Sequence, residues 1–194
     1  ALEGSVFMAG AVVQWMRDIG LIDSAAETKE ISESVTDTNG VVLVPAFVGL
    51  GAPHWDSNAR GILSGLTRGA GREHIVRAGL ESIAYQSWDV MQSMAADANL
   101  QINELRVDGG AAANDFLMQF QADLLNIAVE RPQIIETTAM GAAFLAALGA
   151  DFWTTSDIES LRKVDRQFTP DMAQRHRLAK LKAWKDAVER CRSR

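Results

Sequence analysis

The fold of this chain is decided by the stretch Leu105-Arg106-Val107-Asp108-Gly109-Gly110-Ala111-Ala112-Ala113-Asn114-Asp115-Phe116. A short strand is predicted to end at Val107, two glycines turn the backbone, and a helix is predicted to begin near Asn114. Glycines in such a turn remove the Cβ atoms that would hold a flat ligand away from the backbone. The helix behind the turn presents unpaired N–H groups and a partial positive charge, which suit a phosphate or polarisable ligand. On these residues alone, a structural turn and a ligand-binding turn both remain open.

Strands alternate with long helices on either side of this stretch. Apolar residues at helical spacing predict helices over 5–19, 23–35, 72–98, 114–126, 139–148 and 172–192. Short β-rich runs predict strands over 41–47, 61–66, 104–107 and 128–131, with the second running back beside the first. The helix over 139–148 consists of small residues and can pack very closely against a neighbour, whereas 149–171 is interpreted as irregular. This alternation predicts an α/β fold with helices on both sheet faces.

Composition places the chain among globular proteins with one domain core. Its 194 residues include 47% hydrophobic and 23% charged side chains. The net charge of −6 argues against nucleic-acid binding. Residues 171–194, in contrast, hold eight basic and three acidic side chains. This basic tail is interpreted as a solvated helix face, with a docking surface for an acidic partner as the alternative.

Cysteine and histidine usage favours a cytoplasmic protein without a structural metal. The lone Cys191 provides no disulfide framework, and the three histidines lack the spacing of zinc ligands. No apolar stretch approaches the ~18 residues that a membrane span requires, so no membrane partner is expected. The chain opens at Ala1 without a basic leader and is interpreted as a piece of a longer protein whose other half is missing.

A second glycine of interest lies in the first predicted helix. Gly10 and Gln14 are four residues apart and therefore share one helical face. Glycine inside a helix costs about 1 kcal/mol relative to alanine, so something is expected to offset it. Tight helix packing is one explanation, and a ligand against the bare backbone, with Gln14 hydrogen-bonding to it, is the other. Gly110 and Asn114 repeat the same spacing.

The long loop over 45–61 carries no recognisable catalytic arrangement. Its Gly49-x-Gly51 spacing is not a dinucleotide fingerprint, because no helix follows it. His54 and Asp56 are interpreted as ordinary loop polar groups rather than as an acid–base pair. Arg60 and Glu81 are hypothesised to form a buried ion pair between this loop and the long helix. The sequence shows no nucleophile–histidine arrangement and no evident general-base carboxylate, so we assign no catalytic residue.

Together these segments resemble the C-terminal half of the FGGY family of carbohydrate kinases. Three stretches carry the resemblance: Leu2–Gly10 with Gln14-Trp15, Val44–Gly69 with Gly-Leu-Gly-Ala-Pro-His-Trp-Asp, and Arg106–Gln119. Residues 80–86 and 138–143 agree as well, so the resemblance covers essentially the whole chain. The Gly-Ala-Pro-His-Trp-Asp loop favours family members that act on glycerol over those that act on pentuloses. Gly79 departs from the pattern, because the family more often has a larger residue there.

The resemblance implies a fold and a binding site. It implies an actin-like, ribonuclease-H-type α/β domain with a mixed sheet over residues 1–194, the second of two domains that close around a cleft. Its role would be to bind ATP or ADP. Contacts with the nucleotide would come from the two glycine–carboxamide pairs, with Gly109 and Ala111 shaping the adenine-facing wall. The implied binding residues are Gly10, Gln14, Gly109, Gly110, Ala111 and Asn114.

The resemblance also implies an activity of the longer protein. That protein would transfer the γ-phosphate of ATP to glycerol, giving glycerol 3-phosphate. The missing half would hold glycerol, the general-base aspartate and, with the nucleotide, Mg²⁺. Three alternatives remain: a related sugar kinase such as a xylulokinase, a non-catalytic actin-like nucleotide-binding module, and a dimerisation domain that uses the helix over 139–148 or the basic tail. Formation of a homo-oligomer is left open.

Overall fold

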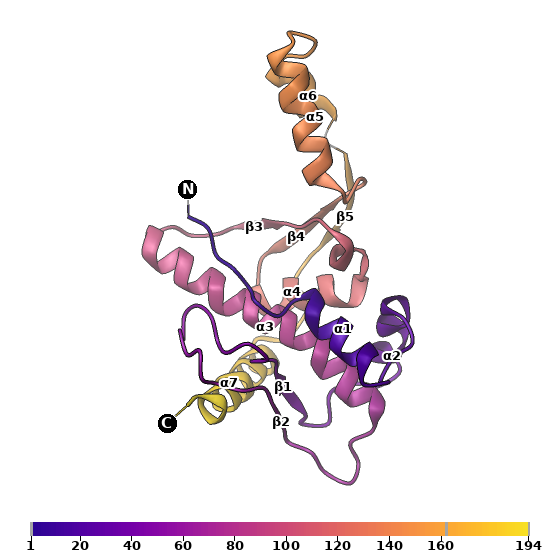
Figure 1. Ribbon diagram of the computed structural model, residues 1–194, viewed down its shortest axis with the longest axis vertical. Helices are drawn as coiled ribbons and strands as arrows, with labels where there is room; N and C mark the ends of the chain where they lie inside the picture. The colour runs from indigo at the N-terminus through magenta and orange to yellow at the C-terminus, as the bar shows by residue number, and fades with distance from the viewer. Residues whose placement is uncertain (1, 162, 194) are drawn as a thin grey trace.

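A computed structural model describes residues 2–161 and 163–193 and places one long helix at the centre of the molecule (Figure 1). This helix, α3, spans Arg72–Ala98, the bounds that the sequence predicts. Several shorter elements pack against it: α1 (Gly10–Asp18), α2 (Thr28–Glu33), α4 (Asp115–Leu125) and β1 (Val42–Val44). Neither described range contains a helix that combines the length and the apolar character needed to cross a membrane.

The strands form two small sheets. β1 pairs antiparallel with β2 (Ile62–Ser64), so the second strand runs back beside the first as predicted. In the other sheet, β4 (Ala128–Pro132) lies between β3 (Glu104–Arg106), which is parallel to it, and β5 (Val164–Phe168), which is antiparallel. Helix α4 packs on β4 and β5, and β1 contacts both α3 and α7 (Gln174–Cys191). The predicted α/β fold with a mixed sheet is therefore confirmed.

The first helix begins later than its sequence pattern indicates. A helix over 5–19 was expected, but α1 starts at Gly10, and residues 2–6 have no regular secondary structure. Within this stretch the chain runs close to α3, because a Cβ atom at Gly4 would lie 2.3 Å from Cγ1 of Val90. The opening segment thus passes against α3 in an extended path rather than as a helical turn.

The interpretation of 149–171 as irregular is wrong for part of that segment, because it contains α6 (Thr155–Leu161) and β5. The sequence of β5 is Val-Asp-Arg-Gln-Phe, and only Phe168 is buried. It is an edge strand with polar side chains on most positions, so it lacks the apolar run that reveals buried strands.

Helix α5 (Thr137–Gly149) projects away from the body of the molecule together with α6 (Figure 1). Its small residues were expected to permit very close packing, yet none of its described residues is buried, and Leu145 is 71% exposed. An edge-to-face contact between Phe144 and Trp153, with ring centroids 5.8 Å apart, joins α5 to the segment that follows it.

Gly79, the residue that departs from the family pattern, permits a close approach of α1 to α3. A Cβ atom at Gly79 would lie 2.6 Å from Sδ of Met16, whose side chain is fully buried. Val12 of α1 is also fully buried. The absent side chain on α3 is therefore compensated by methionine from α1, which fills the available space.

The hypothesised ion pair between Arg60 and Glu81 is wrong. Glu81 is 2% exposed and instead binds Arg77 Nε at 3.1 Å and Lys180 Nζ at 3.1 Å. Arg77 is one turn earlier on α3, and Lys180 comes from α7. Arg60 donates hydrogen bonds to backbone carbonyls of its own loop. The buried carboxylate therefore joins α3 to the C-terminal helix rather than to the loop.

His54 and Asp56 do not form an acid–base pair, in agreement with their interpretation as loop polar groups. His54 Nε2 lies 3.5 Å from Oδ2 of Asp89 on α3. Asp56 accepts hydrogen bonds from the side chain and backbone of Ser193, which lower its pKa. The two side chains attach the loop to different elements.

We expect Glu81→Gln to destabilise the fold by about 3 kcal/mol or more, because Arg77 and Lys180 would lose their shared anion in a buried site. Arg60→Ala is the control and should change the free energy of unfolding by less than about 0.5 kcal/mol, since its bonds are local and exposed. Urea unfolding of both variants measures this. A larger loss for Arg60→Ala than for Glu81→Gln would contradict the assignment.

Candidate functional site

The two glycine sites, distant in sequence, line one cavity of about 240 Å³. Gly10 enters it from the start of α1. Gly110 enters it from the short 3₁₀ helix η2 (Gly110–Ala113), which joins β3 to α4. Five of the six predicted binding residues line this cavity: Gly10, Gln14, Gly110, Ala111 and Asn114.

Gly109, the sixth predicted residue, lies in the turn that leads to the cavity and is not among its lining residues. Its φ is +77°, a left-handed conformation that favours glycine, and its N–H donates to the carbonyl of Ile135 at 2.8 Å. Gly109 therefore does not line the cavity itself, and its part in the nucleotide-facing wall stays a prediction. Backbone geometry requires this glycine, and the two residues after it face the cavity.

Close packing does not explain the other two glycines. For the part of the chain that the structure describes, a Cβ atom at Gly10 or at Gly110 would meet no non-neighbouring atom within 4 Å. Of the two explanations left open for Gly10, helix packing is thus excluded. Two stretches of bare backbone face the same cavity, which leaves room for a flat group between them.

The remaining walls come from residues that sequence reasoning missed. Ala25 and Thr28 belong to η1 (Ala25–Glu27) and α2, and Leu80 and Ile83 come from α3. Val13, Arg17 and Leu117 complete the lining. The apolar ones carry no functional signal, since apolar residues at these spacings indicate helix cores in any globular protein, and Arg17 and Thr28 belong to no motif in the sequence. Only the packing of α1, α2 and α4 around α3 brings them together.

The carboxamide of Asn114 links the glycine-turn side of the cavity to the side formed by η1 and α2. Its Oδ1 accepts a hydrogen bond from the N–H of Leu117 at 3.2 Å and so caps α4. Its Nδ2 donates to Oγ1 of Thr28 at 3.1 Å, and that hydroxyl donates to the carbonyl of Ala25 at 2.7 Å. Because a primary amide has two donor hydrogens and two acceptor lone pairs, one of each remains for a ligand.

Gln14 lies at the exposed rim of the cavity. Its Oε1 accepts from Nη2 of Arg17 at 2.7 Å, and its Nε2 donates to Asp18. Both partners are exposed side chains on the same helix, so these bonds exchange readily with bonds to a ligand.

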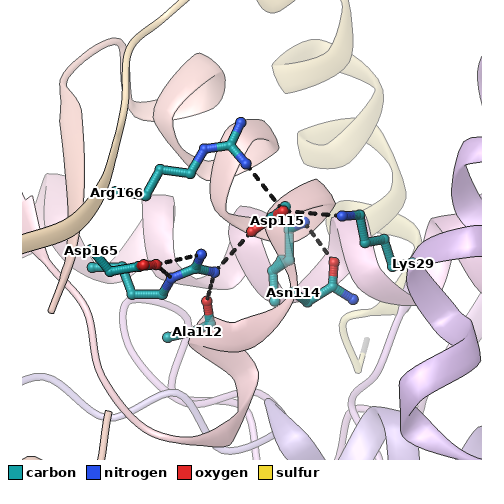
Figure 2. Close-up of polar contacts among 8 residues, drawn as sticks. Lys29, Ala112, Asn114, Asp115, Asp165 and Arg166 are labelled. Atoms are coloured by element: carbon teal, nitrogen blue, oxygen red, sulfur yellow. Dashed lines mark hydrogen bonds and ion pairs between the residues drawn. The ribbon is translucent and has the colours of Figure 1, made fainter. Parts of the chain in front are cut away.

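A charged cluster lies behind the glycine turn (Figure 2). Asp115, the first residue of α4, binds Lys29, Arg131 and Arg166, and Arg131 also binds Asp165. Burial alone would raise the pKa of Asp115, but hydrogen bonds from Lys29 and Arg131 hold it below its ordinary value. The Asp115 carboxylate is therefore charged at neutral pH and links elements on both sides of the turn.

The cavity is chemically suited to binding rather than to proton transfer. Among the described residues that line it, none carries a carboxylate or an imidazole. Within residues 2–161 and 163–193, no group of three or more His, Cys, Asp or Glu side chains could hold a metal ion. The polar groups that it offers are two carboxamides, a hydroxyl, a guanidinium and bare backbone.

A model of the FGGY family of carbohydrate kinases, C-terminal domain, matches residues 1–150. The chain belongs to this family. A glycerol kinase of Caldanaerobacter subterraneus subsp. tengcongensis is 56% identical over 192 residues, which cover 98% of this chain and 39% of that protein. The chain thus spans about two fifths of the length of the curated relatives it matches.

Solved structures of family members have the same fold. A Plasmodium falciparum glycerol kinase with ADP matches with a TM-score of 0.88 and 39% identity, over 95% of this chain and 37% of that one. A ligand-bound xylulose kinase from Lactobacillus acidophilus matches with a TM-score of 0.78 and 23% identity, over 96% of this chain and 38% of that one. The family resemblance and the actin-like fold are confirmed, while the binding role of the individual residues stays a prediction.

Gly10→Ala should leave the fold intact. The added methyl group meets no packed neighbour, and alanine is at least as favourable as glycine in a helix. We therefore expect an unchanged or slightly raised midpoint of thermal unfolding, measured by circular dichroism. A clear decrease would show that Gly10 is needed for packing and would contradict the open environment described above.

Proposed function

We propose that this chain is the nucleotide-binding half of an ATP-dependent kinase that phosphorylates glycerol to glycerol 3-phosphate. The observation that carries the proposal is the cavity that Gly10 and Gly110 both line, each with open space where a side chain would stand. Two findings support it: a relative 56% identical is named glycerol kinase, and a solved structure 39% identical is described as a glycerol kinase with ADP.

The cavity suits a purine base. Gly10 and Gly110 would allow a flat ring to approach the backbone on either side, and Leu80, Ile83 and Leu117 supply apolar surface. The free donor and acceptor of Asn114 and the exchangeable carboxamide of Gln14 would bind polar edges of the ring or the ribose. Binding of the base in this cavity leaves the phosphates to extend towards the rest of the longer protein.

Transfer of the phosphoryl group needs parts that this cavity does not supply. Mg²⁺ prefers oxygen ligands, and the described lining offers no carboxylate, so the phosphate oxygens and residues outside this chain would hold the ion. Phosphoryl transfer depends on in-line positioning and charge neutralisation, and correct alignment can lower the barrier by about 7 kcal/mol or more. Glycerol and its general base would therefore lie on the other part of the protein. Since ATP is the phosphoryl donor, we assign the reaction to the cytoplasm.

The 194-residue chain should bind ADP weakly and should not phosphorylate glycerol. We expect Gly10→Ala to weaken ADP binding about tenfold, equal to about 1.4 kcal/mol, because its methyl group would occupy space needed by the base. Isothermal titration calorimetry measures the affinity, with unfolding curves showing that the variant is folded. Glycerol-dependent formation of ADP by the isolated chain would contradict the division of labour proposed here.

In the longer protein, Asn114→Ala should raise the KM for ATP more than the KM for glycerol. The substitution removes a carboxamide from the nucleotide cavity and leaves the acceptor site untouched. Steady-state kinetics with each substrate varied in turn measure the two KM values. Xylulose in place of glycerol serves as the control acceptor. A larger increase in the KM for glycerol than in the KM for ATP would contradict the placement of Asn114 in the nucleotide site.

A further inference from the structure

We propose that Arg131 and Asp115 are positioning residues for the nucleotide, because together they hold the glycine turn and helix α2 at the separation that the base requires. This inference rests on the proposed function. Neither side chain lines the cavity, so the effect would act through the backbone of the turn and through the residues beside it.

Arg131 joins three elements through one guanidinium group. Its side chain is 12% exposed, and Nη1 donates both to the carbonyl of Ala112 at 2.8 Å and to Oδ1 of Asp115 at 2.9 Å. Its Nη2 and Nε lie 2.7 and 2.8 Å from Oδ2 of Asp165 on β5. The planar fork of arginine suits several simultaneous acceptors of this kind. The backbone of η2, next to Ala111 of the cavity wall, is thereby fixed to the sheet.

Asp115 extends this connection across to the opposite wall. Its Oδ2 lies 3.0 Å from Nζ of Lys29 on α2 and 3.1 Å from Nη1 of Arg166 on β5 (Figure 2). Lys29 directly follows Thr28, a lining residue to which Asn114 also donates. Asn114, which caps α4, and Asp115, its first residue, therefore bind two successive residues of α2. This double link sets the distance between the wall formed by α2 and the wall formed by the turn.

Loss of the Asp115 carboxylate would change this distance. Three cations, from Lys29, Arg131 and Arg166, meet at that single carboxylate, and without it their mutual repulsion is no longer balanced. Lys29 is 41% exposed, so its ammonium can turn away into solvent and release this end of α2, whereas Arg131 stays held by Asp165 of β5. The expected result is a wider cavity in a folded protein. A displacement of about 1 Å at a site can greatly reduce how well the site positions its ligand.

The test compares ADP and adenosine binding of the 194-residue chain with that of Asp115→Asn, which keeps the size of the side chain and removes its charge. We expect the dissociation constant for ADP to rise about fivefold to tenfold. Adenosine carries no charge, so a salt effect on its binding reports the protein's own ion pairs. Its affinity for the wild-type chain should fall between about 50 mM and about 500 mM NaCl, and should be weaker for Asp115→Asn without this decrease, because salt screens the repulsion among the remaining cations.

Matched variants separate positioning from general destabilisation. Asp186→Asn removes the same charge from an exposed pair with Lys182 on α7 and should leave ADP binding unchanged. Asp115→Glu retains the charge and should keep the salt dependence of adenosine binding. If Asp115→Asn does not fold, Lys29→Met removes one arm of the cluster at a half-buried position and should still raise the dissociation constant for ADP.

The outcomes are distinguishable. Normal ADP affinity in a folded Asp115→Asn chain, or in Lys29→Met if the first variant is unfolded, overturns the positioning role and leaves the proposed function standing. Equal salt dependence of adenosine binding in the wild type and Asp115→Asn also overturns it. Failure of the wild-type chain to bind either ADP or adenosine overturns the proposed function, and the positioning role with it.

Discussion

The packing of α1 and α4 against the same central helix is the constraint on which the site depends. Both helices contact α3 (Figure 1). The cavity is lined by residues from α1, from α4 and the turn before it, and by Leu80 and Ile83 of α3. Gly79 permits the close approach of α1, because its missing side chain leaves room for Met16. That Gly10 and Gly110 line one cavity is thus a consequence of core packing, and burial of apolar surface stabilises the geometry of the site.

Charged side chains add specific connections to this apolar framework. The buried Glu81 binds partners from α3 and α7, so removing it would leave cations without their anion in a desolvated place. The cluster around Asp115 lies closer to the surface and joins α2, α4, β4 and β5. The ion pairs of Glu81 hold the C-terminal helix α7 on the core. The cluster around Asp115 is the one that we propose to affect the shape of the cavity.

The exposed helix α5 shows how unevenly this chain buries its apolar residues. Its composition would suit a core, yet its described residues remain accessible, while nearby β5 has a polar sequence and still joins a sheet. Apolar character and burial agree along α3 and α4, where several elements pack around each helix. They disagree where the described structure offers few packing neighbours, because burial depends on what surrounds a segment as well as on its composition.

Sequence alone determined the elements with strong local patterns. The bounds of Arg72–Ala98 were predictable because a long helix repeats its apolar stripe many times, and the turn at Gly109 was predictable because few other residues accept its backbone conformation. It also identified five of the residues that line the cavity. Tertiary structure alone decided that Glu81 binds Lys180, and that Thr28 and Lys29 meet Asn114 and Asp115 across 86 positions of sequence. Such contacts leave no local periodicity, because they arise only when separate helices pack on a common core.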